Sequence, residues 1–327
     1  MKDFKFNLQM FAGNLNTNTT LSAGLSDEMK TYYSDYLIDN AQPELVHDQF
    51  GQKHPIPQNG GKTIEFRKFV PLGKALTPIV EGVTPDGQSL TVTKLEATVA
   101  QYGNYVTLSD IVQLTAIDNT LVETTKLLGA QAGMTLDTVT REVLNGGTSV
   151  IYAGGKDARE ALDETCKLTV DDIYKAARFL KAQNAPKIEG GYVAIIHPDV
   201  AYDLMRDTEW TDVHKYSATT EIFNGEIGKI AGVRFVETTE AKIFADAGAS
   251  NRDVYSTLVL GANAYGVTEL SGGGLQHIVK QLGSGGTSDP LNQRGTAGWK
   301  ATKTAEILVD NYMTRIESCS TFESGAN

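Results

Sequence analysis

The residues closest to an acid–base pair in this chain are His197 and Asp199, on either side of Pro198. An imidazole beside a carboxylate can accept and return a proton, which is the chemistry that many hydrolases use. Pro198 also suits the first turn of a helix, and His197 would then be the residue at which that helix begins. The structural role is the commoner one for such a segment. Hydrolysis by His197 and Asp199 therefore stays the outlying alternative.

The run Gly60-Gly61-Lys62-Thr63 imitates the end of a phosphate-binding loop. The full motif needs a glycine five residues before its second glycine and a helix after it. Ile56 occupies that first position, and the residues from Thr63 onward alternate as in a strand. We therefore expect no nucleotide here, and no cofactor elsewhere in the chain.

Metal binding and thiol chemistry are not indicated either. None of the five histidines has a metal-ligand spacing to another histidine, a cysteine or an acid. The two cysteines, Cys166 and Cys319, are too few and too far apart for a disulfide framework or a zinc site. We expect no metal and no catalytic residue.

The charge balance limits the partners. The 327 residues carry a formal net charge of −11, with a sequence pI of about 5.0. An acidic chain does not neutralise phosphates, so we do not expect sequence-reading nucleic-acid binding, whereas the charge is compatible with enclosing nucleic acid. No apolar run is long enough to span a bilayer, so we expect no membrane partner.

The first half of the chain predicts an arm, a helix and a long hairpin. Residues 1–25 are polar, and residues 26–41 have helical spacing that places Tyr32, Tyr33 and Tyr36 on a packing face rather than on a base-stacking platform. Strand-like runs follow at 63–70 and 89–108, with a wide tip between them. A hairpin of this length cannot bury itself alone, so it packs on its own chain or on a neighbour.

The second half mixes helices and strands. A single apolar stripe predicts a long helix over 118–145, and Thr169 with Asp172 forms a capping box for a helix over 170–184. A buried strand at 192–196 and a short helix from Pro198 follow. Because regular βαβ alternation is absent, the predicted class is α+β. Further strands are expected at 232–238, 254–260, 275–281 and across 298–318.

Several segments, in this order, resemble one family. They read HPDVAYDL at 197–204, IFNGEIGKIAGVRFVE at 222–237, DPLNQRG at 289–295 and GWK at 298–300. The chain resembles the major capsid proteins of tailed bacteriophages, in the branch typified by coliphage N-four. Its start, FNLQMFA at 6–12, is also similar to the start of many phage and prophage capsid proteins.

The resemblance implies the Hong Kong ninety-seven type capsid fold. Its parts would be an N-terminal arm, an extended hairpin loop, a peripheral domain with the spine helix, an axial domain and the return strands of the peripheral domain. In that order they would cover residues 1–58, 59–107, 108–164, 165–270 and 271–327.

The resemblance also implies the function and the partners. The chain would assemble with itself into pentamers and hexamers, forming an icosahedral head shell around double-stranded DNA without sequence-specific binding. Separate scaffold and portal proteins would take part, and assembly would occur in the cytoplasm of the bacterial host. The alternative is the shell protein of a cellular, encapsulin-like nanocompartment. Residues expected at contacts between subunits are Phe66, Arg67, Phe69, Tyr32, Tyr33 and Tyr36.

Overall fold

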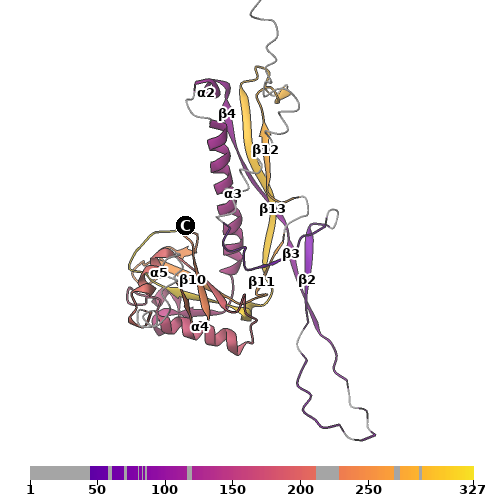
Figure 1. Cartoon of the computed structure of the whole chain (residues 1–327), viewed down its shortest axis with the longest axis vertical. Coiled ribbons are helices and arrows are strands. Elements are labelled where there is room, and N and C mark those ends of the chain that lie inside the picture. Colours follow the sequence, from indigo (N-terminus) through magenta and orange to yellow (C-terminus); the bar gives the residue numbers. More distant parts are fainter. Residues whose placement is uncertain are drawn as a thin grey trace, which may run out of the picture.

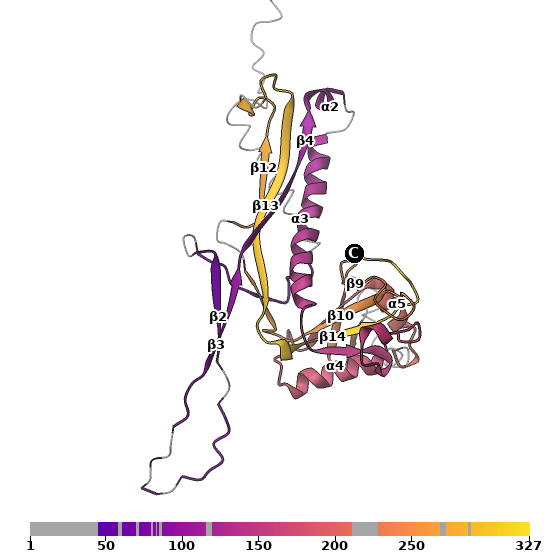
Figure 2. The same cartoon turned by 180° about the vertical axis from the view of Figure 1, so that it is seen from behind.

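Three parts follow one another along the long axis of the molecule (Figure 1). An elongated lobe leads to a compact lobe at its lower end, and a narrow hairpin arm projects past the compact lobe. The view from behind shows the same order (Figure 2). The computed structural model describes residues 45–57, 61–69, 72–79, 81–82, 84, 87–115, 120–210, 228–268, 273–286 and 289–327.

The elongated lobe consists of the helix α3 (Thr120–Leu144) packed along a sheet. The helix predicted over 118–145 is thereby confirmed. Its buried stripe includes Leu128, Ala132 and Leu136, which recur every four residues and so lie on one side. That stripe packs against Ala297, Trp299 and Ala301 of the central strand.

The central strand of this sheet is β13 (Arg294–Ile307), which every other strand but one contacts directly. β4 (Ala100–Ser109) pairs with it antiparallel over ten residue pairs, from Arg294↔Ser109 to Lys303↔Ala100. β12 (Gln276–Lys280) and β11 (Tyr265–Thr268) also pair with β13, and β1 (Gln52–Lys53) extends the sheet beyond β11. The short helix α2 (Asp110–Thr115) joins β4 to the segment before α3.

The predicted hairpin is only partly correct. The run expected as one strand over 89–108 divides at Val99 into two. β3 (Val92–Thr98) pairs with β2 (Thr63–Phe69) in the arm, whereas β4 belongs to the sheet of the elongated lobe. The run across 298–318 also divides, because β13 ends at Ile307 and the turn η6 (Asp310–Tyr312) precedes β14 (Met313–Ser318).

The compact lobe is built on a seven-stranded mixed sheet covered on one face by two helices. The helices are α4 (Val170–Ala182) and α5 (Pro198–Met205). The main strand order is β5-β14-β10-β6-β8-β7, and β9 pairs with β10. The strands not yet bounded are β5 (Val150–Tyr152), β6 (Tyr192–Ile196), β7 (Lys229–Ile230), β8 (Val233–Glu237), β9 (Ile243–Phe244) and β10 (Val254–Leu260); the turns η3 (Ala153–Gly155) and η4 (Arg159–Ala161) follow β5.

Both predicted helix starts in this lobe are confirmed. Thr169 and Asp172 form the capping box of α4, in which each side chain binds the backbone N–H of the other residue. α5 begins with Pro198 at its first turn, and His197 is its N-cap.

The core of the molecule continues from one lobe into the other through β10, whose residues are all buried. Tyr255 and Val259 face the helices α4 and α5. Leu258 and Leu260 point to the opposite side, where they join a cluster with Leu144 at the end of α3. Successive side chains of a strand alternate between faces, so one strand contributes to both cores.

Some predictions lie outside the described residues. These are the arm over 1–25, the helix over 26–41 with its three tyrosines, and most of the GEIG segment before Gly228.

Candidate assembly surfaces

His197 and Asp199, the predicted acid–base pair, are engaged in local structure. The Nδ1 of His197 accepts a hydrogen bond of 3.2 Å from the backbone N–H of Asp199, as an N-cap does. Burial lowers the pKa of the His197 imidazole, and the nearby Asp199 carboxylate opposes that shift.

The carboxylates of α5 hold the last residues of the chain. Asp199 accepts hydrogen bonds from the hydroxyls of Tyr255 (2.9 Å) and Ser324 (2.6 Å). Asp203 accepts bonds from Ser320 and from Thr321. Burial alone would raise the pKa of Asp203, but these bonds lower it. The segment 320–327 is therefore fastened across α5, and the two carboxylates act as its anchors.

Metal and membrane sites find no support in the described part of the chain. There, no three His, Cys, Asp or Glu side chains are grouped so that they could hold a metal ion. No described helix has the length and apolar character needed to cross a membrane. Both cysteines are buried thiols, and burial raises the pKa of Cys319 to about 11.

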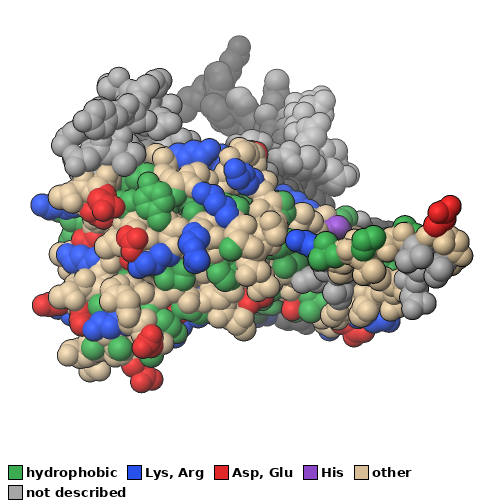
Figure 3. All heavy atoms as spheres, turned by 90° about the horizontal axis from the view of Figure 1, so that it is seen from below, with side chains coloured by type: hydrophobic (Ala, Val, Ile, Leu, Met, Phe, Trp, Pro, Cys, Tyr) green, Lys and Arg blue, Asp and Glu red, His purple; other side chains and the backbone are tan. Residues whose placement is uncertain are grey.

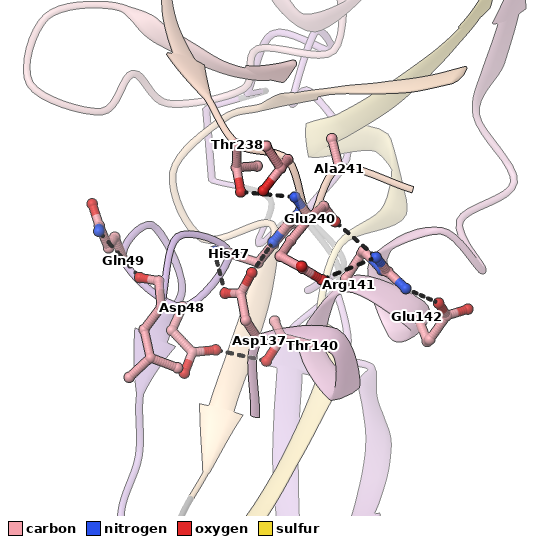
Figure 4. Close-up of polar contacts among 12 residues, drawn as sticks. His47, Asp48, Gln49, Asp137, Thr140, Arg141, Glu142, Thr238, Glu240 and Ala241 are labelled. Atoms are coloured by element: carbon pink, nitrogen blue, oxygen red, sulfur yellow. Dashed lines mark hydrogen bonds and ion pairs between the residues drawn. The ribbon is translucent and has the colours of Figure 1, made fainter. Parts of the chain in front are cut away.

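A buried polar network joins the start of the described chain to α3 (Figure 4). Asp137 accepts a 2.7 Å bond from the backbone N–H of His47 and lies 2.6 Å from its Nδ1. Asp48 accepts a 2.6 Å bond from the hydroxyl of Thr140 and pairs with the ammonium of Lys303. The segment before β1 is thereby held to both the helix and the sheet.

Arg141 links the base of α3 to the compact lobe, and only 2% of it is exposed. Its guanidinium donates to the carbonyl of Glu240 (2.9 Å), to the carboxylate of Glu142 (3.0 Å) and to the backbone oxygen of Asn327 (3.1 Å). Lys242 pairs with the same Glu142 carboxylate at 2.7 Å. A planar guanidinium can serve several acceptors at once, which suits it to this junction.

The predicted contact residues of the hairpin arm differ in their surroundings. Phe66 is half-buried, and its ring lies against Gly266 of β11 and edge-on to His54. Arg67 is exposed and pairs with Glu65, which also pairs with Lys94 on β3. The hydrogen bonds from Arg67 and Lys94 lower the pKa of Glu65. Phe69 ends β2, its side chain is not described, and Tyr32, Tyr33 and Tyr36 lie outside the described residues.

The tip of the arm exposes apolar side chains that were not among the predicted contact residues. Leu76 is 82% exposed, Ile79 76%, Leu90 68% and Leu72 57%. Several large apolar side chains that stay exposed in one loop indicate an interaction surface. The sequence shows only that these residues are apolar and lie in a segment with several glycines and prolines, which does not indicate that they stay exposed.

A second apolar surface lies at the other end of the long axis, on and beside α2 (Figure 1). Leu114 is 83% exposed, and Ile111 and Leu127 are exposed as well. The helix α2 was not predicted, because the strand-like run read from the sequence ends at 108 and the long helix begins only at 118. Its start is set by Ser109 and Asp110, whose side chains accept bonds from backbone N–H groups of the first turn.

The sheet of the elongated lobe carries a groove of about 630 Å³ on its outer face. Gly103 and Gly298 line the groove without filling it, because they carry no side chains, and Tyr105 and Ile278 also line it. Tyr105 is 69% exposed. The apolar tip, the α2 end and this groove are therefore three candidate surfaces of the described chain for binding another protein.

A family model described as a phage capsid protein matches residues 92–313. Among solved structures, the capsid of Ralstonia phage GP4 aligns with a TM-score of 0.69 at 16% identity, covering 86% of this chain and 90% of that one. The capsid of cyanophage P-SCSP1u aligns with a TM-score of 0.66 at 14% identity, covering 85% and 89%. A virus-like particle from Pyrococcus furiosus aligns with a TM-score of 0.52 at 12% identity, covering 88% and 99%. A search of curated proteins finds no match.

Proposed function

This chain belongs to the phage capsid protein family, and from that premise we propose how its surfaces build a shell. It is a major capsid protein, a structural subunit that assembles with copies of itself into the capsid of a virion. Its fold is the Hong Kong ninety-seven type. The proposal concerns the form of the shell, the partners and the residues that make the contacts.

The shell is proposed to be icosahedral, built of pentamers and hexamers, and to enclose double-stranded DNA without reading its sequence. The net charge of −11 supports an enclosing role rather than a phosphate-binding one. Separate scaffold and portal proteins and assembly in the cytoplasm of the bacterial host belong to the same proposal. The chain is proposed to have no catalytic activity, since His197 and Asp199 are both engaged in structural hydrogen bonds.

We assign the parts of the family fold as follows. The elongated lobe corresponds to the peripheral domain with its spine helix α3, and the compact lobe to the axial domain. The extended hairpin loop ends before Ala100, because β4 is paired with β13. β5 and β14 belong to the axial sheet, so the chain crosses between domains more often than the boundaries at 164 and 270 suggest.

The observation that carries the assembly proposal is the apolar tip. Within the described residues, Leu72, Leu76 and Ile79 remain largely exposed and join none of the clusters of the core. Burying one such side chain contributes about 1.5–3 kcal/mol, so covering several of them on a neighbour would stabilise a subunit contact substantially. We propose that the tip lies on an adjacent subunit.

The test replaces the apolar tip while leaving the lobes intact. The variant Leu76→Ser with Ile79→Ser is compared with Lys74→Ser with Thr77→Ser, which changes exposed residues of the same loop. Negative-stain microscopy and sedimentation should show that the apolar variant stays as folded subunits or small oligomers while the control forms shells. A normal yield of shells from the apolar variant would contradict the proposal that the tip lies on an adjacent subunit.

The contact residues predicted from the sequence stay proposals, and their surroundings in the fold differ. Arg67 faces solvent and can contact a neighbour directly, whereas Phe66 attaches the arm to β11 of its own chain. We expect Arg67→Ala to weaken assembly without changing subunit stability, and Phe66→Ala to loosen the arm. Phe69, Tyr32, Tyr33 and Tyr36 are proposed as contacts on sequence grounds alone.

The nanocompartment shell is the second candidate because it would have the same fold. The likeness to the Pyrococcus furiosus particle is a likeness of fold. The family model favours the phage shell.

A further inference from the structure

The lower face of the compact lobe is positively charged although the chain as a whole is acidic. Seen from below, several Lys and Arg side chains lie close together in the middle of this face (Figure 3). α4 runs along the lower edge of the lobe (Figures 1 and 2). Its exposed or half-buried cations and those of the loop and strands beside it are Lys175, Arg178, Lys181, Lys187, Lys229 and Arg234.

Only part of this positive charge is neutralised locally. Lys175 pairs with Asp171 and Asp172, and Arg234 pairs with Glu189. The other four cations have no ion-pair partner among the residues that the structure describes. The Lys229 side chain lies beside Gly191, where the loop after α4 returns to β6, and Lys187 belongs to that same loop.

The upper edge of the same lobe is acidic. β8 carries Arg234 near its start and the exposed Glu237 at its end. The two residues are therefore about 10 Å apart along the strand, at about 3.3 Å per residue. β9 and the C-terminal end lie along this upper edge (Figure 2). Asp246 follows β9, and Glu323 belongs to the fastened C-terminal segment.

These acids outweigh the cations beside them. Glu142 and Glu240 also lie here, at the base of α3 and between β8 and β9. The buried Arg141 pairs with both of these acids. The partly exposed cations at this edge are Lys242, which also pairs with Glu142, and Arg252, which pairs with Glu323 and Glu164. Glu237 and Asp246 have no ion pair within the described residues.

We propose that the lower face of one compact lobe binds the upper edge of the compact lobe of a second copy of this chain. Opposite charges on opposite sides of one subunit make a heterologous, head-to-tail contact, which closes into a ring when the rotation between subunits allows it. The proposal deepens the shell function and rests on it, because it states which surfaces meet within one capsomer.

The partner is a second copy rather than a nucleic acid for two reasons. The acidic surface that complements the lower face is present on the same chain, and the net charge of −11 repels polyanions from the rest of the molecule. The hairpin arm also projects past the lower face (Figures 1 and 2), so a neighbour held by the arm would face α4 as well.

The experiment reverses the charge of each surface separately and then together. The lower-face variant is Arg178→Glu, Lys181→Glu and Lys187→Glu; the upper-edge variant is Glu237→Lys, Asp246→Lys and Glu323→Lys. All six side chains are exposed, and circular dichroism melting checks that each variant folds. Assembly is measured by sedimentation and negative-stain microscopy at 0.1 M salt, where charges more than about 10 Å apart are screened from each other.

Each single-surface variant should lose at least tenfold in the yield of rings and shells, because like charges then meet. The chain carrying all six reversals restores opposite charges across the contact and should recover assembly. A mixture of the two single-surface variants should recover rings in which the two chains alternate.

Each other outcome contradicts the inference. Normal shells from both single-surface variants would show that these surfaces do not meet, while leaving the capsid function intact. If the chain with all six reversals folds but does not recover assembly, the two surfaces do not bind each other. If the lower-face variant assembles normally but its shells retain less DNA, the basic face binds nucleic acid instead.

Discussion

At the residue scale, the contact between His47 and Asp137 connects positions 90 apart in the chain. Both side chains are fully buried, and the Nε2 of His47 has no hydrogen-bond partner among the described residues. Because the buried imidazole has a partner at only one of its nitrogens, losing that partner costs a large amount of folding free energy. The pair therefore contributes, together with the contacts of Asp48, to holding the segment before β1 in place.

We expect Asp137→Ala to destabilise the subunit by about 3–5 kcal/mol, because it leaves His47 buried without a partner. Asp137→Asn should cost about 1–3 kcal/mol, since its amide oxygen still accepts a bond from the backbone N–H of His47. Urea unfolding of dissociated subunits measures both. Equal midpoints for the two variants would contradict this expectation, because the acceptor oxygen that Asn retains would then contribute nothing.

The pH dependence of stability follows from His197. Burial holds its folded-state pKa below the usual value of about 6.5, so the unfolded chain binds more protons as the pH falls through that value. Stability is therefore present above about pH 6.5 and is lost on acidification toward the lower folded-state pKa.

The variant His197→Asn keeps an N-cap acceptor and removes the titration. Between pH 7.5 and 5.5 its melting temperature should fall less than that of the parent chain. Other titrating groups, among them His277, whose pKa is also lowered by burial, contribute equally to both chains. The difference between the two slopes of melting temperature against pH therefore reports His197 alone. Identical slopes would contradict the assignment.

Residue types alone indicated some of these roles and not others. His197 was correctly identified as a helix-entry residue because Pro198 and Asp199 are its neighbours in sequence. The partners of His47 and Arg141 could not be found this way, since they come from distant segments and no local pattern records them.

At the element scale, the helices α3, α4 and α5 were predictable from local patterns, whereas most of the strand pairings were not. The stripe of α3 and the capping box of α4 are local patterns. Val92–Thr98 and Ala100–Ser109 read as one extended run, because both are rich in residues that favour strands. The two strands differ in the strand with which each pairs. β3 pairs with β2, which is nearby in sequence, whereas β4 pairs with β13, which lies almost two hundred residues away.

The β4–β13 ladder depends on glycine at a close approach. A Cβ at Gly298 would lie 2.7 Å from the Cβ of Tyr105 and 2.8 Å from the carbonyl oxygen of Asn104. We expect Gly298→Ala to destabilise the subunit by about 1–3 kcal/mol through this overlap. Gly87→Ala, which meets no atom within 4 Å, is the control in denaturant unfolding. A loss of the same size in both would refute the argument.

At the scale of the whole molecule, the family resemblance supplied what composition could not. Charge and composition excluded several classes of function, but a mixed α+β chain has no intrinsic signal for a shell. The apolar tip became visible only when the arm was seen to project from the lobes, since exposure is a property of the complete fold. Its partner surface belongs to another copy of the chain.

The position of the arm also has a mechanical consequence. A neighbour that pulls on β3 pulls directly on β4, along the axis of the ten paired residues that join β4 to β13. Under such a shearing load the hydrogen bonds of the ladder resist together, whereas a peeling load would break them one after another. We expect shells made from Gly298→Ala subunits to yield at lower force in nanoindentation. The tensile strength of the particle would then reside in a single long strand pair in each subunit.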